Sequence, residues 1–89
     1  SNLAVGPHDF YVIRNKATGE LFHFGETGRG FKTRELEHIK YYNDLGYEVE
    51  SQLLKTVNSK SAAKALESKY ISKYIEYFGK RPPYNPVNH

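Results

Sequence analysis

Hydrophobic and polar positions follow two different periods along this chain. Residues 9–14 and 20–25 are rich in aromatic and β-branched side chains, which is typical of strands. The turn-forming cluster 15–19 separates them. We therefore predict a β-hairpin centred on Ala17.

The register of this hairpin decides which side chains share a face. A turn centred on Ala17 pairs Tyr11 with His23, so these two side chains become cross-strand neighbours. Because strand side chains alternate between faces, the same register predicts a core layer formed by Phe10, Val12, Phe22 and Phe24.

The remainder of the chain predicts a helix, a third strand and a second helix. The first helix begins at about Arg34 with Thr33 as its N-cap, and Gly46 ends it. Residues 47–57 form the third extended segment. Ser59 or Ser61 is the N-cap of the second helix, and Gly79 ends this helix.

This order predicts an α/β (α+β) fold with a mainly antiparallel three-stranded sheet flanked by helices. We expect one domain over residues 9–89, preceded by a tail or linker at residues 1–8. The chain has 89 residues, no cysteine, a net charge of +3 and 15% aromatic residues. Disulfides and thiolate zinc sites are therefore excluded, and the modest positive charge permits nucleic acid as a partner. No apolar run approaches the roughly 18 residues of a membrane span.

One carboxylate interrupts the apolar stripe of the second helix. At 100° per residue, Glu67 projects from the middle of a stripe formed by Ala63, Tyr70, Ile71, Tyr74, Tyr77 and Phe78. An ionised carboxylate on a core-facing stripe needs a cation or hydrogen-bond donors. A metal ion at Glu67 and a pairing with Lys64, one turn back, are both open interpretations.

Two further groups carry candidate chemistry. Arg34 and His38 are four residues apart and therefore project from the same face of the first helix. This pair is either a solvated surface pair or a phosphate-binding guanidinium beside a proton-exchanging imidazole. Asn85 lies in a proline-rich segment. It is either an ordinary turn residue or the residue that ties this C-terminal segment to the candidate site.

These residues, taken in order, resemble the pattern of the GIY-YIG endonuclease superfamily. Asp9 to Tyr11 resembles the first half-motif, and His23 to Thr27, after eleven intervening residues, resembles the second. Asp9 and His23 depart from the family, which has glycine and tyrosine at these places.

The resemblance implies a metal-dependent endonuclease that hydrolyses phosphodiester bonds, with DNA favoured over RNA. It implies Glu67 as the ligand of a Mg²⁺ or Mn²⁺ ion and Tyr11 as a group that activates or positions water. The resemblance also assigns catalytic roles to the residues that stand at the family's other motif positions. These are His23, Arg34, His38 and Asn85.

Substrate binding is assigned to cations outside this set: Arg29, Lys32, Lys80 and Arg81. Such phosphate contacts predict weak sequence specificity. A small domain of this kind suits the C-terminal module of a secreted polymorphic toxin that is delivered to the target-cell cytoplasm and paired with an immunity protein. A cytoplasmic stand-alone nuclease is the other setting.

The alternative is a catalytically silent nucleic-acid-binding or protein-interaction domain on the same fold, as the altered Asp9 and His23 positions suggest. Geometry separates the two readings. The enzyme is favoured by convergence of five side chains on one open basic concavity: Tyr11, His23, Arg34, His38 and Glu67. The silent domain is favoured if Glu67 is buried among phenol hydroxyls and Arg34 points to bulk solvent.

Overall fold

The computed structural model describes residues 5–85 of the chain and shows three strands and two helices. The order of the elements is that predicted from the sequence: β1 (Val5–Asn15), β2 (Leu21–Thr27), α1 (Phe31–Asp44), β3 (Val49–Ser59) and α2 (Lys60–Phe78). The strands form one antiparallel sheet in the order β2-β1-β3. The predicted fold class is therefore confirmed.

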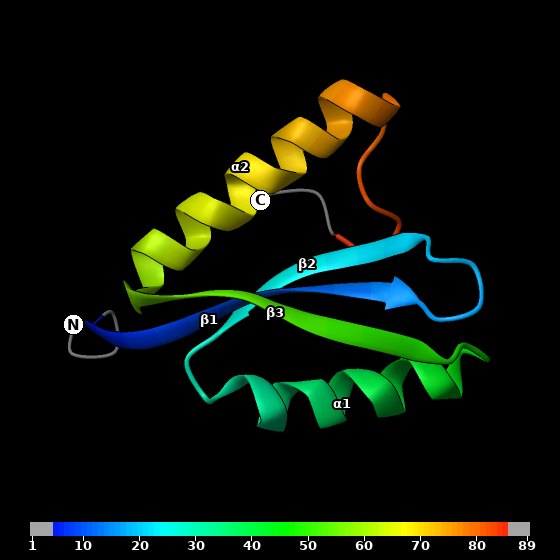
Figure 1. Ribbon diagram of the computed structural model, residues 1–89, viewed down its shortest axis with the longest axis horizontal. Helices are drawn as coiled ribbons and strands as arrows, with labels where there is room; N and C mark the ends of the chain where they lie inside the picture. Colours follow the sequence, from blue (N-terminus) through cyan, green and yellow to red (C-terminus); the bar gives the residue numbers. More distant parts are fainter. Residues whose placement is uncertain (1–4, 86–89) are drawn as a thin grey trace.

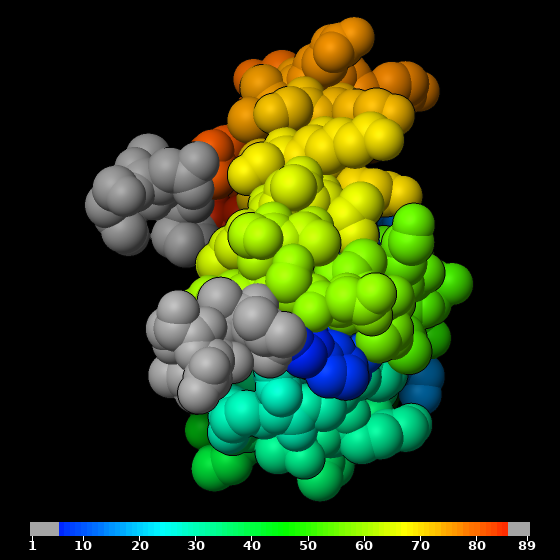
Figure 2. Space-filling model, turned by 90° about the vertical axis from the view of Figure 1, so that its left-hand side faces the viewer, coloured from blue at the N-terminus to red at the C-terminus, as the bar shows by residue number. Residues whose placement is uncertain are grey.

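The sheet lies between the two helices, so the domain has three layers. Helix α2 covers one face and α1 covers the other (Figure 1). Seen from the end of the sheet, α2 forms the top of the molecule and α1 the bottom, with the strands between them (Figure 2). None of the helices within residues 5–85 has the length and apolarity needed to cross a bilayer.

Each face of the sheet carries its own apolar cluster. The cluster under α2 contains Phe10, Val12, Phe24 and Ile71. The cluster facing α1 contains Tyr11, Ile13, Phe22 and Tyr42. The two clusters alternate along β1, as the pleat of a central strand with two covered faces requires.

The hairpin register differs from the predicted one by two residues. Val12 pairs with Phe24 and Ile13 with His23, whereas Tyr11 lies opposite Gly25. A bulge follows, because the next residue of β1, Arg14, pairs with Leu21. The predicted pairing of Tyr11 with His23 is therefore wrong.

The bulge also corrects the predicted core layer. It leaves Phe22 without a partner in β1 and turns its side chain to the α1 face, where Phe22 packs in the cluster of Tyr11 and Tyr42. Leu21 packs against the opposite cluster instead. Phe10, Val12 and Phe24 do share a face, as predicted.

Element boundaries show smaller differences. Strand β1 begins at Val5, so residues 5–8 belong to the sheet rather than to a tail; residues 1–4 of the expected tail lie outside the described residues. Helix α1 begins at Phe31, three residues before the predicted start, and the residue before it, Gly30, has a φ of 91° and offers no side-chain cap.

Asp9 supplies the missing cap of α1. One of its carboxylate oxygens accepts a hydrogen bond from the backbone N–H of Phe31 at 2.8 Å. The other accepts from the Thr56 hydroxyl at 2.7 Å. A carboxylate at a helix N-terminus is favourable because the first N–H groups have no partner inside the helix. Asp9 thus ties β1 to both α1 and β3.

Helix α2 begins and ends as predicted. The Ser59 hydroxyl accepts a hydrogen bond from the Ala62 N–H, and Gly79 closes the helix in the left-handed conformation. The predicted apolar stripe is only partly buried, however. Ala63 and Ile71 are buried, whereas Tyr77 is 83% exposed and Phe78 56% exposed. The C-terminal end of α2 rises away from the sheet (Figure 1), which leaves these two side chains uncovered.

Candidate active site

Tyr11 lies at the centre of the candidate site. Its side chain is 2% exposed and crosses β2 directly over Gly25. A Cβ atom at residue 25 would lie 2.5 Å from the Tyr11 hydroxyl oxygen, so only glycine leaves room for the ring. Burial raises the pKa of Tyr11 to about 12, and the nearby Arg34 partly offsets this effect. Tyr11 is therefore a neutral phenol at pH 7.

His38, on α1, is the hydrogen-bond partner of this phenol. The Tyr11 hydroxyl and Nε2 of His38 are joined by a buried hydrogen bond of 2.7 Å. Burial, followed by the positive charge of Arg34, lowers the pKa of His38 to about 4. A neutral imidazole accepts a proton at one ring nitrogen, so the pair can pass a proton between the two side chains.

His23 is the second imidazole near Tyr11. Nδ1 of His23 donates a hydrogen bond to the backbone carbonyl of Tyr84 at 3.0 Å, which leaves Nε2 as the acceptor nitrogen of the neutral ring. Burial lowers its pKa. The ring centroids of His23 and Tyr11 are 6.3 Å apart, and those of His23 and His38 are 5.3 Å apart. The three side chains are thus neighbours although the predicted strand pairing is wrong.

Arg34 lies beside this cluster and is half-buried. Its guanidinium donates a hydrogen bond to the Glu37 carboxylate at 2.7 Å. Arg29 binds the same carboxylate with two hydrogen bonds of 2.6 and 3.0 Å. These two guanidinium groups lower the pKa of Glu37 to about 2. Glu37 therefore holds Arg34 and Arg29 together, and sequence analysis did not single it out.

Glu67 is partly buried as predicted, with a side-chain exposure of 21%. The Lys64 ammonium lies 3.6 Å from Glu67 and 3.4 Å from Glu26, so it is shared between two carboxylates. Burial raises the pKa of Glu67, Lys64 lowers it and Glu26 raises it. Both carboxylates also raise the pKa of Tyr11, to a smaller extent than burial does.

Glu26 is a site residue that sequence analysis missed. Its side chain is 12% exposed. The signal that would have found it is strand alternation: Glu26 is two residues from Phe24, whose side chain faces α2, so Glu26 faces α2 and Glu67 as well.

Asn85 holds the C-terminal segment against the free edge of β2. Its side-chain oxygen accepts a hydrogen bond from the Phe24 N–H, and its side-chain nitrogen donates one to the Phe24 carbonyl, each at 2.8 Å. The Tyr84 N–H donates to the Phe22 carbonyl at 2.9 Å. Asn85 is 7% exposed. Its amide is used on the backbone of β2, so it positions the site rather than contacting a ligand.

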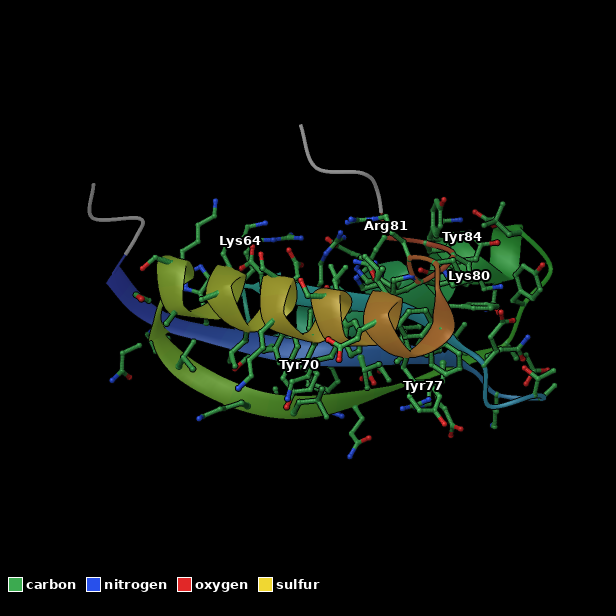
Figure 3. All side chains as sticks on the ribbon, turned by 90° about the horizontal axis from the view of Figure 1, so that it is seen from above. Lys64, Tyr70, Tyr77, Lys80, Arg81 and Tyr84 are labelled. Atoms are coloured by element: carbon green, nitrogen blue, oxygen red, sulfur yellow. The ribbon has the colours of Figure 1, made fainter. Side chains whose placement is uncertain are left out.

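The four predicted substrate-binding cations differ in their surroundings. Arg29 is paired with Glu37, and Lys32 lies 3.5 Å from Glu35. Lys80 is exposed and Arg81 half-buried. Figure 3 shows Lys80 and Arg81 on the same side of α2 as Lys64 and Tyr84.

A cleft of about 220 Å³ joins most of these groups. Its lining comes from β2, from α1 and from the C-terminal segment: His23, Arg34, Glu37, His38, Tyr41, Tyr42 and Tyr84. Tyr11 adjoins the cleft through its hydrogen bond to His38. Three predicted residues thus line one cleft and Tyr11 borders it, whereas Glu67 lies outside the lining.

The donor set available to a metal ion is small. Within residues 5–85 no group of three or more His, Cys, Asp or Glu side chains is placed to hold one. Glu67 and Glu26 are two oxygen donors directed at one cation, the Lys64 ammonium. This set fits a hard divalent ion that keeps most of its water, and it does not fit a fully protein-bound metal.

Comparisons with protein families, curated proteins and solved structures give no match for this chain. The resemblance to GIY-YIG endonucleases therefore stays a prediction that the sequence motifs carry.

Proposed function

We propose that this domain is a metal-dependent endonuclease of the GIY-YIG type that hydrolyses phosphodiester bonds, in DNA rather than RNA. The observation that carries the proposal is the hydrogen bond of 2.7 Å between the Tyr11 hydroxyl and the neutral His38 imidazole, beside the Arg34 guanidinium. It joins a proton-transfer pair to a phosphate-binding group at one cleft.

The proton path begins at the Tyr11 oxygen. Tyr11 donates its hydroxyl proton to Nε2 of His38 and accepts a proton from the attacking water, so the phenol is regenerated. A pKa of about 4 makes His38 a weak base in the free protein, partly because of Arg34. A bound phosphate offsets the charge of Arg34, so substrate raises the pKa of His38 and strengthens the base.

Arg34 binds the phosphate oxygens and stabilises the charge that develops on them. Glu37 keeps Arg34 in place until substrate arrives. Glu67, with Glu26 beside it, would hold Mg²⁺ or Mn²⁺, which supplies charge neutralisation at the phosphate. His23 fixes the Tyr84 segment, and Asn85 holds that segment on β2.

Metal-dependent cleavage tests this proposal. The purified domain is incubated with plasmid DNA and total RNA in Mg²⁺, in Mn²⁺ and in EDTA, beside Tyr11→Phe and Glu67→Gln. Exposed residues of the same types on α2 provide the controls Tyr77→Phe and Glu76→Gln. We expect cutting only with metal, lost in the first two variants and kept in the controls.

Intact nucleic acid in every metal condition, with binding retained, would instead support the silent-domain alternative. The ion pairs that occupy Arg34 and Glu67 favour that alternative. The proposed role as a toxin module with an immunity partner rests on the sequence resemblance, and the same assays apply to it.

A further inference from the structure

Tyrosine rings form one end of the candidate active-site cleft. Three of its lining residues are tyrosines, Tyr41 and Tyr42 from α1 and Tyr84 from the C-terminal segment. The proton path of the proposed nuclease uses none of them. Their arrangement therefore calls for a separate explanation.

The three rings form a floor and two walls. Tyr42 is 2% exposed and lies beneath the other two. The Tyr41 ring stands at 85° to it and the Tyr84 ring at 89°, each with a centroid distance of 5.1 Å. Two aromatic rings thus lie nearly perpendicular to a buried third.

Tyr84 is fixed in position, whereas Tyr41 is a 53% exposed side chain on α1 whose ring packs against Tyr42. The Tyr84 backbone is held by two hydrogen bonds, from its N–H to Phe22 and from His23 to its carbonyl, and its ring packs 5.0 Å from that of Phe22. Rigid aromatic side chains lose little conformational freedom when a ligand binds between them.

Size and charge identify the class of ligand. At about 220 Å³ the cleft is smaller than the roughly 300 Å³ that drug-sized ligands occupy, so a single planar ring system suits it. Arg34 lines the same cleft and attracts a phosphate. A nucleotide combines a planar ring system with a phosphate, and it is the ligand of this kind that the proposed nuclease would meet.

We propose that this cleft binds the base of an unpaired nucleotide, stacked against Tyr41 and Tyr84, whose phosphate lies at Arg34. The inference rests on the proposed function and names its substrate class: single-stranded nucleic acid, or an unpaired segment within a duplex. A base inside a duplex is stacked between its neighbours and does not reach such a cleft. Stacking accepts every base, so the site discriminates by pairing state rather than by sequence.

Binding without cleavage tests the proposal directly. An oligothymidine carrying one 2-aminopurine is titrated with the protein in EDTA, and a fully paired duplex with the same label is titrated in parallel. We expect binding to quench the fluorescence of the single strand, because stacking on tyrosine quenches 2-aminopurine. The duplex is expected to show no quenching.

Tyr41→Ala is the decisive variant, because Tyr41 is 53% exposed and its removal leaves the core intact. Loss of one stacking partner is expected to weaken single-strand binding roughly 5- to 150-fold and to remove quenching. Tyr41→Phe keeps the ring and is expected to bind like the wild type. Tyr77→Ala is the matched control, because Tyr77 lies on the other side of α2 from Tyr84 (Figure 3).

The outcomes separate this inference from the proposed nuclease. Unchanged single-strand affinity and quenching in Tyr41→Ala would overturn the base-binding cleft, even if the domain cuts nucleic acid. Quenching that depends on Tyr41, without cleavage in any metal, would support the cleft and overturn the nuclease. Absence of nucleic-acid binding by the wild type would overturn both.

Discussion

Replacing Gly25 by alanine is the most direct test of how the fold positions Tyr11. The new Cβ would lie 2.5 Å from both Cζ and the hydroxyl oxygen of Tyr11 and 2.7 Å from Cε1. All three distances are shorter than any normal contact, and the ring is 2% exposed. Tyr11 must therefore shift away from β2, which disturbs its hydrogen bond with His38.

The cost has two parts. Overpacking a well-packed site costs about 1–3 kcal/mol. Loss of the Tyr11–His38 hydrogen bond costs about 0.5–1.5 kcal/mol more. A domain of this size loses about 4–8 °C of melting temperature per kcal/mol, so the combined cost of about 1.5–4.5 kcal/mol predicts a fall of roughly 6–36 °C. The proposed nuclease activity should disappear at temperatures where the variant is still folded.

A double-mutant cycle with Tyr11→Leu identifies the cause. Removing the ring removes the clash, so Gly25→Ala should cost much less in the Tyr11→Leu background than in the wild type. Melting curves of the four proteins give the coupling energy. An unchanged melting temperature in Gly25→Ala, or strictly additive effects in the cycle, would refute the reasoning.

Three further predictions concern the surroundings of the site. Asn85→Ala leaves the buried N–H and carbonyl of Phe24 without their partner, so we expect a loss of about 1–3 kcal/mol in denaturant unfolding and faster hydrogen exchange at the Phe24 amide. Folding lowers the pKa of His38 from 6.5 to about 4, so the unfolded chain binds more protons than the folded protein between these two pH values. The contribution of His38 to stability is therefore complete above pH 6.5 and is lost as the pH falls toward 4. In melting curves recorded across this pH range, His38→Gln should lose stability less steeply than the wild type. Lys64→Met removes the cation that lowers the pKa of Glu67, so an NMR titration of the Glu67 carboxyl should show a higher pKa than in the wild type.

Matched variants make these results interpretable. Asn58→Ala, at an exposed position of β3, should leave stability and the Phe24 amide unchanged. Lys69→Met, at an exposed position of α2, should leave the Glu67 titration unchanged. Equal slopes with pH for wild type and His38→Gln would show that His38 titrates normally in the folded protein.

The fold was predictable because local signals agree with one another. Ser59 and Gly79 mark the ends of α2 by cap chemistry that acts within a few residues, and the strands have clear composition. Glu67 stood out because its charge conflicts with its neighbours on the helix. Signals of this kind need no knowledge of the tertiary structure.

The hairpin register was not predictable, because it depends on a bulge that the turn sequence does not reveal. The bulge turns the side chain of Phe22 to the α1 face. It also makes Ile13, rather than the predicted Tyr11, the cross-strand partner of His23. Glu37 was missed because its partner Arg29 lies outside the helix, in the loop before α1. Strand alternation places Glu26 on the α2 face, but its partner Lys64 lies on another segment.

The contact between Asn85 and β2 has a consequence for synthesis of the protein. The two hydrogen bonds join residues 61 positions apart, and the same segment carries the Tyr84 wall of the cleft. A ribosome releases the chain from its N-terminus, so β1, β2 and α1 emerge long before Tyr84 and Asn85. The cleft therefore has no third side until Tyr84 and Asn85 have been synthesised and have docked on β2, so the candidate site is completed only after the sheet and both helices have emerged.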